Sequence, residues 1–207
     1  MVAHSSGTTI ALQLALDHPA LVRTLCLSEP PLIDALVAPE DRAAVQAMLG
    51  PVIGSAMAAT ARGDLPAAFD TFMTAVCGPA YRRVIAGTLG PDVLAAAEHG
   101  CRYFFTDEMP AAATWTLDAA AIAQPVLLVQ GGASPPPVHR LVSRLAALLP
   151  DATVTTIAGA DHLLPLTAPA ELGALIDDLI SHAGGGAVAV PDARSPAGTA
   201  YPTGRSG

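Results

Sequence analysis

The sequence predicts an α/β fold, built on a parallel sheet with crossover helices and an all-helical insertion. Strand-like and helix-like patterns alternate over residues 2–27, as they do where parallel strands are joined by helices. The continuous apolar run at residues 125–129 is typical of a strand that such a sheet buries on both faces. Between these regions, residues 34–122 show helical patterns and no convincing strand.

The first core segment, residues 1–33, is expected to contain a helix and a strand. Polar residues recur at i, i+4 and i+8 across residues 6–18, which predicts a helix with one narrow polar stripe and an otherwise buried surface. A strand is expected at 21–27, and Glu29 follows it. Because chemistry gathers at the carboxyl ends of parallel strands, Glu29 stands where a functional carboxylate is expected.

The helical insertion, residues 34–122, is expected to form a cap over the core. Its glycine- and proline-containing breaks divide it into separate helices. These helices are predicted near 40–62, 64–77, 79–88, 91–105 and 108–122. The insertion holds every Phe, Tyr and Trp of the chain but one. Such side chains suit the roof of an apolar pocket, although packing of the helices against one another is the more ordinary explanation for any one of them.

The second core segment, residues 123–183, contains the apolar run, a further helix, a short strand at 153–157 and a last amphipathic helix that begins near Pro169. The loop after the short strand carries His162. Residues 184–207 are rich in Gly, Pro, Ala and Ser, and this composition predicts a disordered tail.

The composition argues against several classes of function. The formal net charge is −8 and the basic residues form no stripe, so no nucleic-acid partner is expected. No run of about 18 strongly apolar residues predicts a membrane span, and the N-terminus does not resemble a secretory signal, so a cytoplasmic protein is expected. The three cysteines are widely spaced, and neither metal-ligand spacing nor a phosphate-binding loop occurs, so no metal or cofactor is expected.

Residues 3–7, Ala-His-Ser-Ser-Gly, have the small-x-Ser-x-Gly pattern of a nucleophile elbow. An elbow holds a serine in strained backbone between a strand and a helix, so the residues two positions before and after it are expected to be small. Gly7 meets this condition, and Ala3 replaces the usual glycine. The pattern therefore selects Ser5, and not Ser6, as the candidate nucleophile.

Ser5, an acid and His162 follow the chain order of an α/β-hydrolase triad. A serine hydroxyl is a weak nucleophile until an imidazole takes its proton, and the imidazole needs a carboxylate to fix its tautomer. The elbow with its alanine-rich helix, the strand at 125–132 and the Gly-Ala-Asp-His loop at 159–162 resemble the matching parts of α/β-hydrolase-fold enzymes. The resemblance covers residues 2–182. It implies a partial α/β-hydrolase fold and a serine hydrolase of the esterase or lipase-like kind, without a cofactor.

The acid of this expected triad departs from a common pattern of the family. In many members the acid follows the first closing strand in a Gly-x-x-Asp arrangement, but the corresponding place here, counted from Gly131, holds Ser134. Other members use a carboxylate after the strand that follows the elbow helix, and Glu29 matches that place. Glu29 is therefore the preferred acid, with a structural role beside the pocket as the alternative. Three other carboxylates fit less well: Asp118, Asp151 and Asp161.

Only four residues precede Ser5, whereas the family's fold places several strands before the elbow. One of their loops donates a backbone N–H to the oxyanion hole, so the backbone N–H of Ser6 is the donor expected here. His4 is expected to have a structural role beside the nucleophile. The strands that precede the elbow in the family are thus expected to be missing from this chain.

These features predict a serine hydrolase that cleaves an ester or a related acyl bond. Ser5 attacks, His162 transfers the proton and Glu29 orients His162. The apolar cap favours a small, uncharged, partly hydrophobic substrate, and the serine nucleophile argues against the dehalogenase and epoxide hydrolase branch of the family. The alternative is a truncated, non-catalytic remnant that keeps the motif without the activity. Neither the substrate nor the oligomeric state follows from the sequence.

Overall fold

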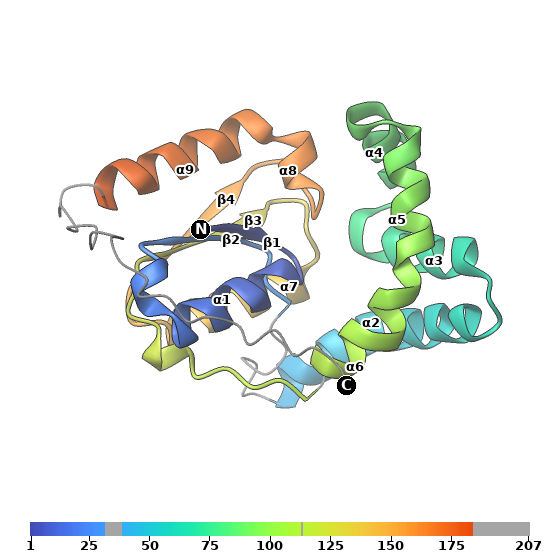
Figure 1. The fold of residues 1–207 in the computed structure, drawn as a ribbon, viewed down its shortest axis with the longest axis horizontal. Coiled ribbons are helices and arrows are strands. Elements are labelled where there is room, and N and C mark those ends of the chain that lie inside the picture. Colours follow the sequence, from blue (N-terminus) through green and yellow to red (C-terminus); the bar gives the residue numbers. More distant parts are fainter. Residues whose placement is uncertain (32–38, 113, 184–207) are drawn as a thin grey trace, which may run out of the picture.

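The computed structural model describes residues 1–31, 39–112 and 114–183. Four parallel strands form one sheet in the order β1-β2-β3-β4, and helices lie on both of its faces (Figure 1). The strands are β1 (Val2–His4), β2 (Leu25–Ser28), β3 (Val126–Gly131) and β4 (Ala152–Ile157). The predicted parallel sheet with crossover helices is confirmed.

Side chains that alternate along β2 and β3 are buried on opposite faces of the sheet. One face packs against α1 (Gly7–Asp17) and α7 (Pro136–Leu148). The other face packs against α8 (Leu164–Thr167) and α9 (Pro169–Ala183). The first face buries Leu25, Leu27, Val126 and Leu128, and the second buries Cys26, Leu127 and Val129. Because helices cover both faces, the two central strands have the continuous apolar sequence of buried parallel strands.

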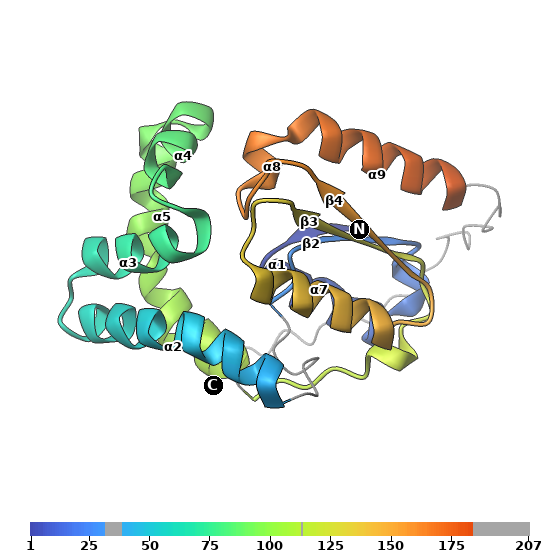
Figure 2. The ribbon, with the colours of Figure 1, turned by 180° about the vertical axis from the view of Figure 1, so that it is seen from behind.

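A separate group of helices lies beside the sheet, on the side of α8 (Figures 1 and 2). It comprises α2 (Pro39–Ala61), α3 (Leu65–Cys77), α4 (Tyr81–Leu89), α5 (Pro91–Tyr103), the π-helical turn η3 (Phe104–Glu108) and α6 (Met109–Ala112). These helices bury their own apolar cluster, which includes Tyr81 and Phe105. Leu163 belongs to the same cluster, so the helical group contacts the loop that carries His162.

Two predicted elements differ from the structure. The strand expected at 21–27 begins only at Leu25, because Pro19–Leu21 forms a 3-10 turn, η1. The helix expected at 108–122 reaches only Ala112 in the described residues, and a 3-10 turn, η4, follows at Ala119–Ala121. Trp115, between them, donates a hydrogen bond from Nε1 to Oε1 of Gln13 over 2.8 Å. This long-range contact with α1 outweighs the local helical propensity. The tail expected at 184–207 lies outside the described residues.

Among the described helices, α2 is the one that is long and apolar enough to cross a membrane by length and composition. It also contains a proline, Pro51. Near its start, Asp41 forms ion pairs with Arg140 (3.3 Å) and Arg144 (3.2 Å) of α7, and Val45 packs on Leu141. In this fold α2 therefore joins the helical group to the core.

Candidate active site

Ser5 lies in the turn between β1 and α1, with a φ of 51°. This is the left-handed region, which residues other than glycine rarely adopt, so the backbone at Ser5 is strained as the elbow motif predicts. The N–H of Ser5 donates to the carbonyl of Ser28 (2.9 Å), and the N–H of Thr8 donates to the carbonyl of Ser5 (2.9 Å). The turn thus lies against β2, with which the three residues of β1 pair.

The crowding predicted around the elbow does not involve Gly7 in this structure. An ideal Cβ built on Gly7 would meet no heavy atom within 4 Å among the described residues. The backbone at Ser5 is therefore strained, as predicted. The prediction that crowding requires a small residue at Gly7 is wrong, because no described residue would contact a Cβ there.

Ser5, His162 and Glu29 come together at the carboxyl ends of the strands. Nε2 of His162 lies 3.0 Å from Oγ of Ser5. On the other side of the ring, Nδ1 of His162 lies 2.7 Å from Oε2 of Glu29. Ser5 follows β1, Glu29 follows β2 and His162 lies in the loop after β4. This hydrogen-bonded chain has the arrangement of nucleophile, base and acid that acyl transfer by a serine requires.

Among the described residues, no hydrogen bond joins the other candidate acids to the imidazole of His162. Oδ1 of Asp161 accepts a hydrogen bond from the N–H of Leu163 over 2.9 Å. Asp151 directly precedes the amino end of β4, and Asp118 precedes the 3-10 turn before β3. Both therefore lie toward the amino ends of the strands, whereas Ser5 lies at the carboxyl ends.

Glu29 is buried, and both of its carboxylate oxygens have hydrogen-bond partners. It is 2% exposed, and its backbone φ of 49° also lies in the left-handed region. Its Oε1 accepts hydrogen bonds from the N–H of Gly131 (2.8 Å) and from the hydroxyl of Ser134. Burial alone would raise the pKa of Glu29, but the hydrogen bonds from His162, Ser134 and Gly131 outweigh it and lower the pKa below its usual value. The carboxylate is therefore held as an anion beside His162.

In the sequence, Ser134 stood out only because it occupies a place where many family members have the acid. Its contact with Glu29 was not predicted. The available signal was its position, because the loop after β3 ends beside the loop after β2 when β2 and β3 are neighbours. A small polar residue at the place of an acid is a candidate hydrogen-bond partner for an acid that has moved to the adjacent strand.

His4 contacts the histidine rather than the serine. Its Nε2 lies 2.8 Å from the carbonyl oxygen of His162, and the two rings are tilted with centroids 4.6 Å apart. Burial, together with the nearby charge of His162, lowers the pKa of His4 to about 4. Neutral His4 therefore donates from Nε2 to the backbone of His162 and supports its loop.

Ser6 precedes α1, and its N–H makes no backbone hydrogen bond among the described residues. The N-terminal end of a helix is the positive end of its dipole and favours negative charge. An unpaired N–H directly after the nucleophile is also where an oxyanion donor of this kind of site is expected. Across residues 1–31, 39–112 and 114–183, no group of three His, Cys, Asp or Glu side chains could hold a metal ion.

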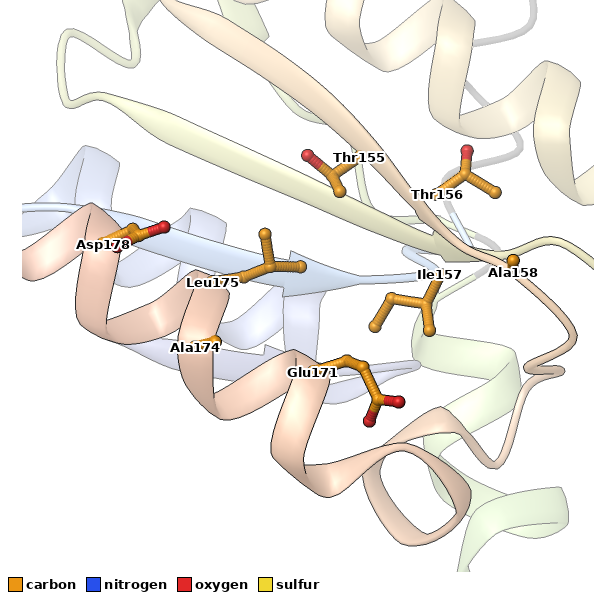
Figure 3. A pocket seen from close by; sticks show the side chains of 8 residues that line it. All are labelled: Thr155, Thr156, Ile157, Ala158, Glu171, Ala174, Leu175 and Asp178. Carbon is orange, nitrogen blue, oxygen red and sulfur yellow. The ribbon is translucent and has the colours of Figure 1, made fainter.

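A hollow of about 350 Å³ lies elsewhere, between β4 and α9 (Figure 3). Thr155, Leu175 and Asp178 are among the residues that line it, and none of the candidate site residues does. The hollow belongs to the face of the sheet that α9 covers, so it is separate from the candidate active site.

Residues 1–175 match a sequence family described as the alpha/beta hydrolase family. Among curated proteins, no sequence matches this chain. Solved structures with a similar fold include MenH from S. aureus, with a TM-score of 0.64, 14% identity and coverage of 88% of this chain and 68% of that one.

Two other solved structures have a similar fold. The enol-lactonase from Burkholderia xenovorans has a TM-score of 0.63 and 16% identity, and the match covers 87% of this chain and 64% of that one. The epoxide hydrolase from Bacillus megaterium has a TM-score of 0.60 and 16% identity, with coverage of 87% and 68%. At these identities the likeness shows the fold alone. The chain spans about two thirds of the length of the structures it matches.

Proposed function

The chain belongs to the α/β-hydrolase family, and from that premise we propose that it is a serine hydrolase that cleaves an ester or a related acyl bond. The α/β-hydrolase fold supports several chemistries, so the proposal depends on the site and not on the fold. The observation that carries it is the hydrogen-bonded chain from Ser5 Oγ through His162 to Glu29, with distances of 3.0 and 2.7 Å.

The first half of the reaction transfers the acyl group to Ser5. Oγ attacks the acyl carbonyl carbon while Nε2 of His162 accepts the hydroxyl proton, and Glu29 stabilises the imidazolium through Nδ1–H. The N–H of Ser6 donates to the oxyanion of the tetrahedral intermediate. The intermediate then collapses, and the imidazolium gives its proton to the departing alcohol.

The second half of the reaction releases the acid. A water molecule loses a proton to Nε2 of His162 and attacks the acyl carbon, and the second intermediate expels Ser5 Oγ, which regains the proton. The products are an alcohol and a carboxylic acid. Ser5 and His162 recover their starting protonation states, because the proton that Ser5 loses leaves on the alcohol and is replaced by one from the water.

The helical group suggests the character of the substrate. It packs on Leu163, next to His162, and its apolar cluster includes Phe69 and Phe105, with Phe72 and Phe104 packed against it. Apolar side chains with few charged groups suit a ligand that is itself largely apolar. We therefore propose a small, uncharged, partly hydrophobic ester as substrate.

Hydrolysis of p-nitrophenyl esters from acetate to octanoate tests this function. We expect p-nitrophenol release above the background rate by the unaltered chain, and loss of this activity in Ser5→Ala. Equal rates for the two proteins, both shown to be folded by circular dichroism, would instead support a non-catalytic remnant.

A further inference from the structure

We propose that Ser134 is a positioning residue of this site, whose hydroxyl holds the carboxylate of Glu29 in the orientation that presents Oε2 to His162. The inference rests on the proposed function and extends it to a side chain that acts only through Glu29. Ser134 follows β3, at the position where many family members have the acid, and the proposal gives this serine a role in the reaction.

The hydrogen bonds divide the two oxygens of Glu29 between two tasks. Oε1 accepts from the hydroxyl of Ser134 and from the N–H of Gly131, which is 2.8 Å away. Oε2 faces Nδ1 of His162 at 2.7 Å. Two donors on one oxygen fix both the position and the plane of the carboxylate, so the second oxygen is aimed at the imidazole. Ser134 is 5% exposed, so water has little access to replace its hydroxyl.

The backbone of Glu29 makes such a hold necessary. Its φ of 49° is unfavourable for a residue with a side chain, and such conformations persist only where surrounding contacts impose them. The side chain contributes contacts through Ser134, Gly131 and His162. Loss of the Ser134 hydroxyl leaves Oε1 with a single donor on a strained residue.

The loop of Ser134 is also tied to the loop of His162. The N–H of Gly132 donates to the carbonyl of Ile157, and the N–H of Ala133 donates to the carbonyl of Ala160, both over 2.8 Å. The backbones are so close that a Cβ on Gly131 would lie 2.4 Å from the carbonyl oxygen of Ala160. Residues 131–134 therefore bind Glu29 through the hydroxyl of Ser134 and the N–H of Gly131. Backbone hydrogen bonds from Gly132 and Ala133 join the same residues to the segment that leads to His162.

The test compares three substitutions of Ser134 with a matched control. Ser134→Ala removes the donor, Ser134→Cys keeps a similar volume with a much weaker donor, and Ser134→Thr retains a hydroxyl. The control is Ser28→Ala. Ser28 directly precedes Glu29 and is 1% exposed, but its hydroxyl has no hydrogen-bond partner among the described residues. Both serines are buried beside Glu29, but only the hydroxyl of Ser134 donates a hydrogen bond to its carboxylate.

The first readout does not depend on activity. Carbon-13 NMR of the full chain follows the titration of the Glu29 carboxyl group. Burial opposes ionisation of Glu29, and the hydrogen bonds, including the one from Ser134, favour it. We therefore expect the titration midpoint of Glu29 to rise in Ser134→Ala and Ser134→Cys, and to stay near its original value in Ser134→Thr and Ser28→Ala.

The second readout is ester hydrolysis. A hydrogen bond to a charged group contributes enough that its loss should lower kcat by about tenfold to a hundredfold in Ser134→Ala. KM should not change, because Ser134 acts through the acid and not on the substrate. Ser134→Thr should recover most of kcat.

The outcomes separate the inference from the proposed function. An unchanged midpoint and an unchanged kcat in folded Ser134→Ala and Ser134→Cys would overturn the positioning role while leaving the hydrolase proposal intact. An equal loss in Ser28→Ala would also overturn it. If no variant hydrolyses esters but the Glu29 midpoint rises only in Ser134→Ala and Ser134→Cys, then the hydrolase proposal fails and the hold on Glu29 stands.

Discussion

Replacement of Glu29 by glutamine should impose the wrong tautomer on His162. The amide carbonyl of Gln takes the place of Oε1, because the N–H of Gly131 and the hydroxyl of Ser134 both donate there. The amide NH₂ group then stands 2.7 Å from Nδ1 of His162. Since an NH₂ group can only donate, Nδ1 must become the acceptor and the ring proton moves to Nε2. Nε2 faces Ser5 Oγ at 3.0 Å and can no longer take its proton.

The size of the effect follows from this geometry. Where an amide replaces the acid of a serine triad and leaves the geometry intact, kcat falls by about 10⁴. We expect Glu29→Gln to lose about 10³–10⁴ in kcat toward p-nitrophenyl esters with KM nearly unchanged, because Glu29 is 2% exposed and has no surface to offer a substrate. The substitution keeps the volume and the donors at Oε1, so the variant should remain folded.

Steady-state hydrolysis and thermal unfolding of the same preparations measure this prediction. Glu29→Asp keeps the charge but is shorter by one methylene group, so its activity should lie between that of the original chain and that of Glu29→Gln. A wrong tautomer is expected to lower kcat by orders of magnitude. A kcat of Glu29→Gln within about threefold of that of the original chain would therefore refute the reasoning. Loss of activity in Asp161→Asn instead would identify Asp161 as the acid.

Two further predictions concern stability. Because the pKa of His4 falls from 6.5 to about 4 on folding, the unfolded chain binds this proton more readily between these values, and stability drops as the pH falls through them. At pH 5 the loss from His4 should be about 1–2 kcal/mol after allowance for solvent screening. His4→Gln should remove this part of the pH dependence, and urea unfolding at pH 7 and pH 5 checks it: the same pH dependence in both proteins contradicts the assignment. Gly131→Ala should lower the free energy of unfolding by about 1–3 kcal/mol, because its Cβ would lie 2.4 Å from the carbonyl oxygen of Ala160. Gly173→Ala, in α9 with nothing within 4 Å of its Cβ, is the control, and equal thermal midpoints for the two variants would show that the loops can separate freely.

Much of the core could be predicted because its signals are local. Sequence periodicity predicts which side of an element is buried. This was enough to predict β3 from its apolar run and α1 from its periodic residues. The helix expected through Trp115 was wrong because a partner 102 residues away, Gln13, decides where the indole lies. No local pattern contains that contact.

The candidate site shows the same division. Ser5 and His162 stand in motifs whose neighbours in the chain define them, so the sequence could select both. The acid remained open between Glu29 and other carboxylates, because the choice depends on which loop ends beside the imidazole. The structure places Glu29 2.7 Å from Nδ1 of His162. The partners of Ser134 and His4 could not be predicted, because each contacts a residue more than 100 positions away.

Reaction with a fluorophosphonate, followed by mass spectrometry of the proteolysed chain, tests the central claim most directly. The reagent phosphonylates a serine only when a base activates it, so the measurement depends on Ser5 and His162 together and not on the unknown substrate. We predict a single adduct on the peptide that contains Ser5, no adduct in Ser5→Ala, and much slower labelling in Glu29→Gln. A folded chain that stays unlabelled, or one labelled at another serine, would contradict the assignment of Ser5, His162 and Glu29 as a working triad.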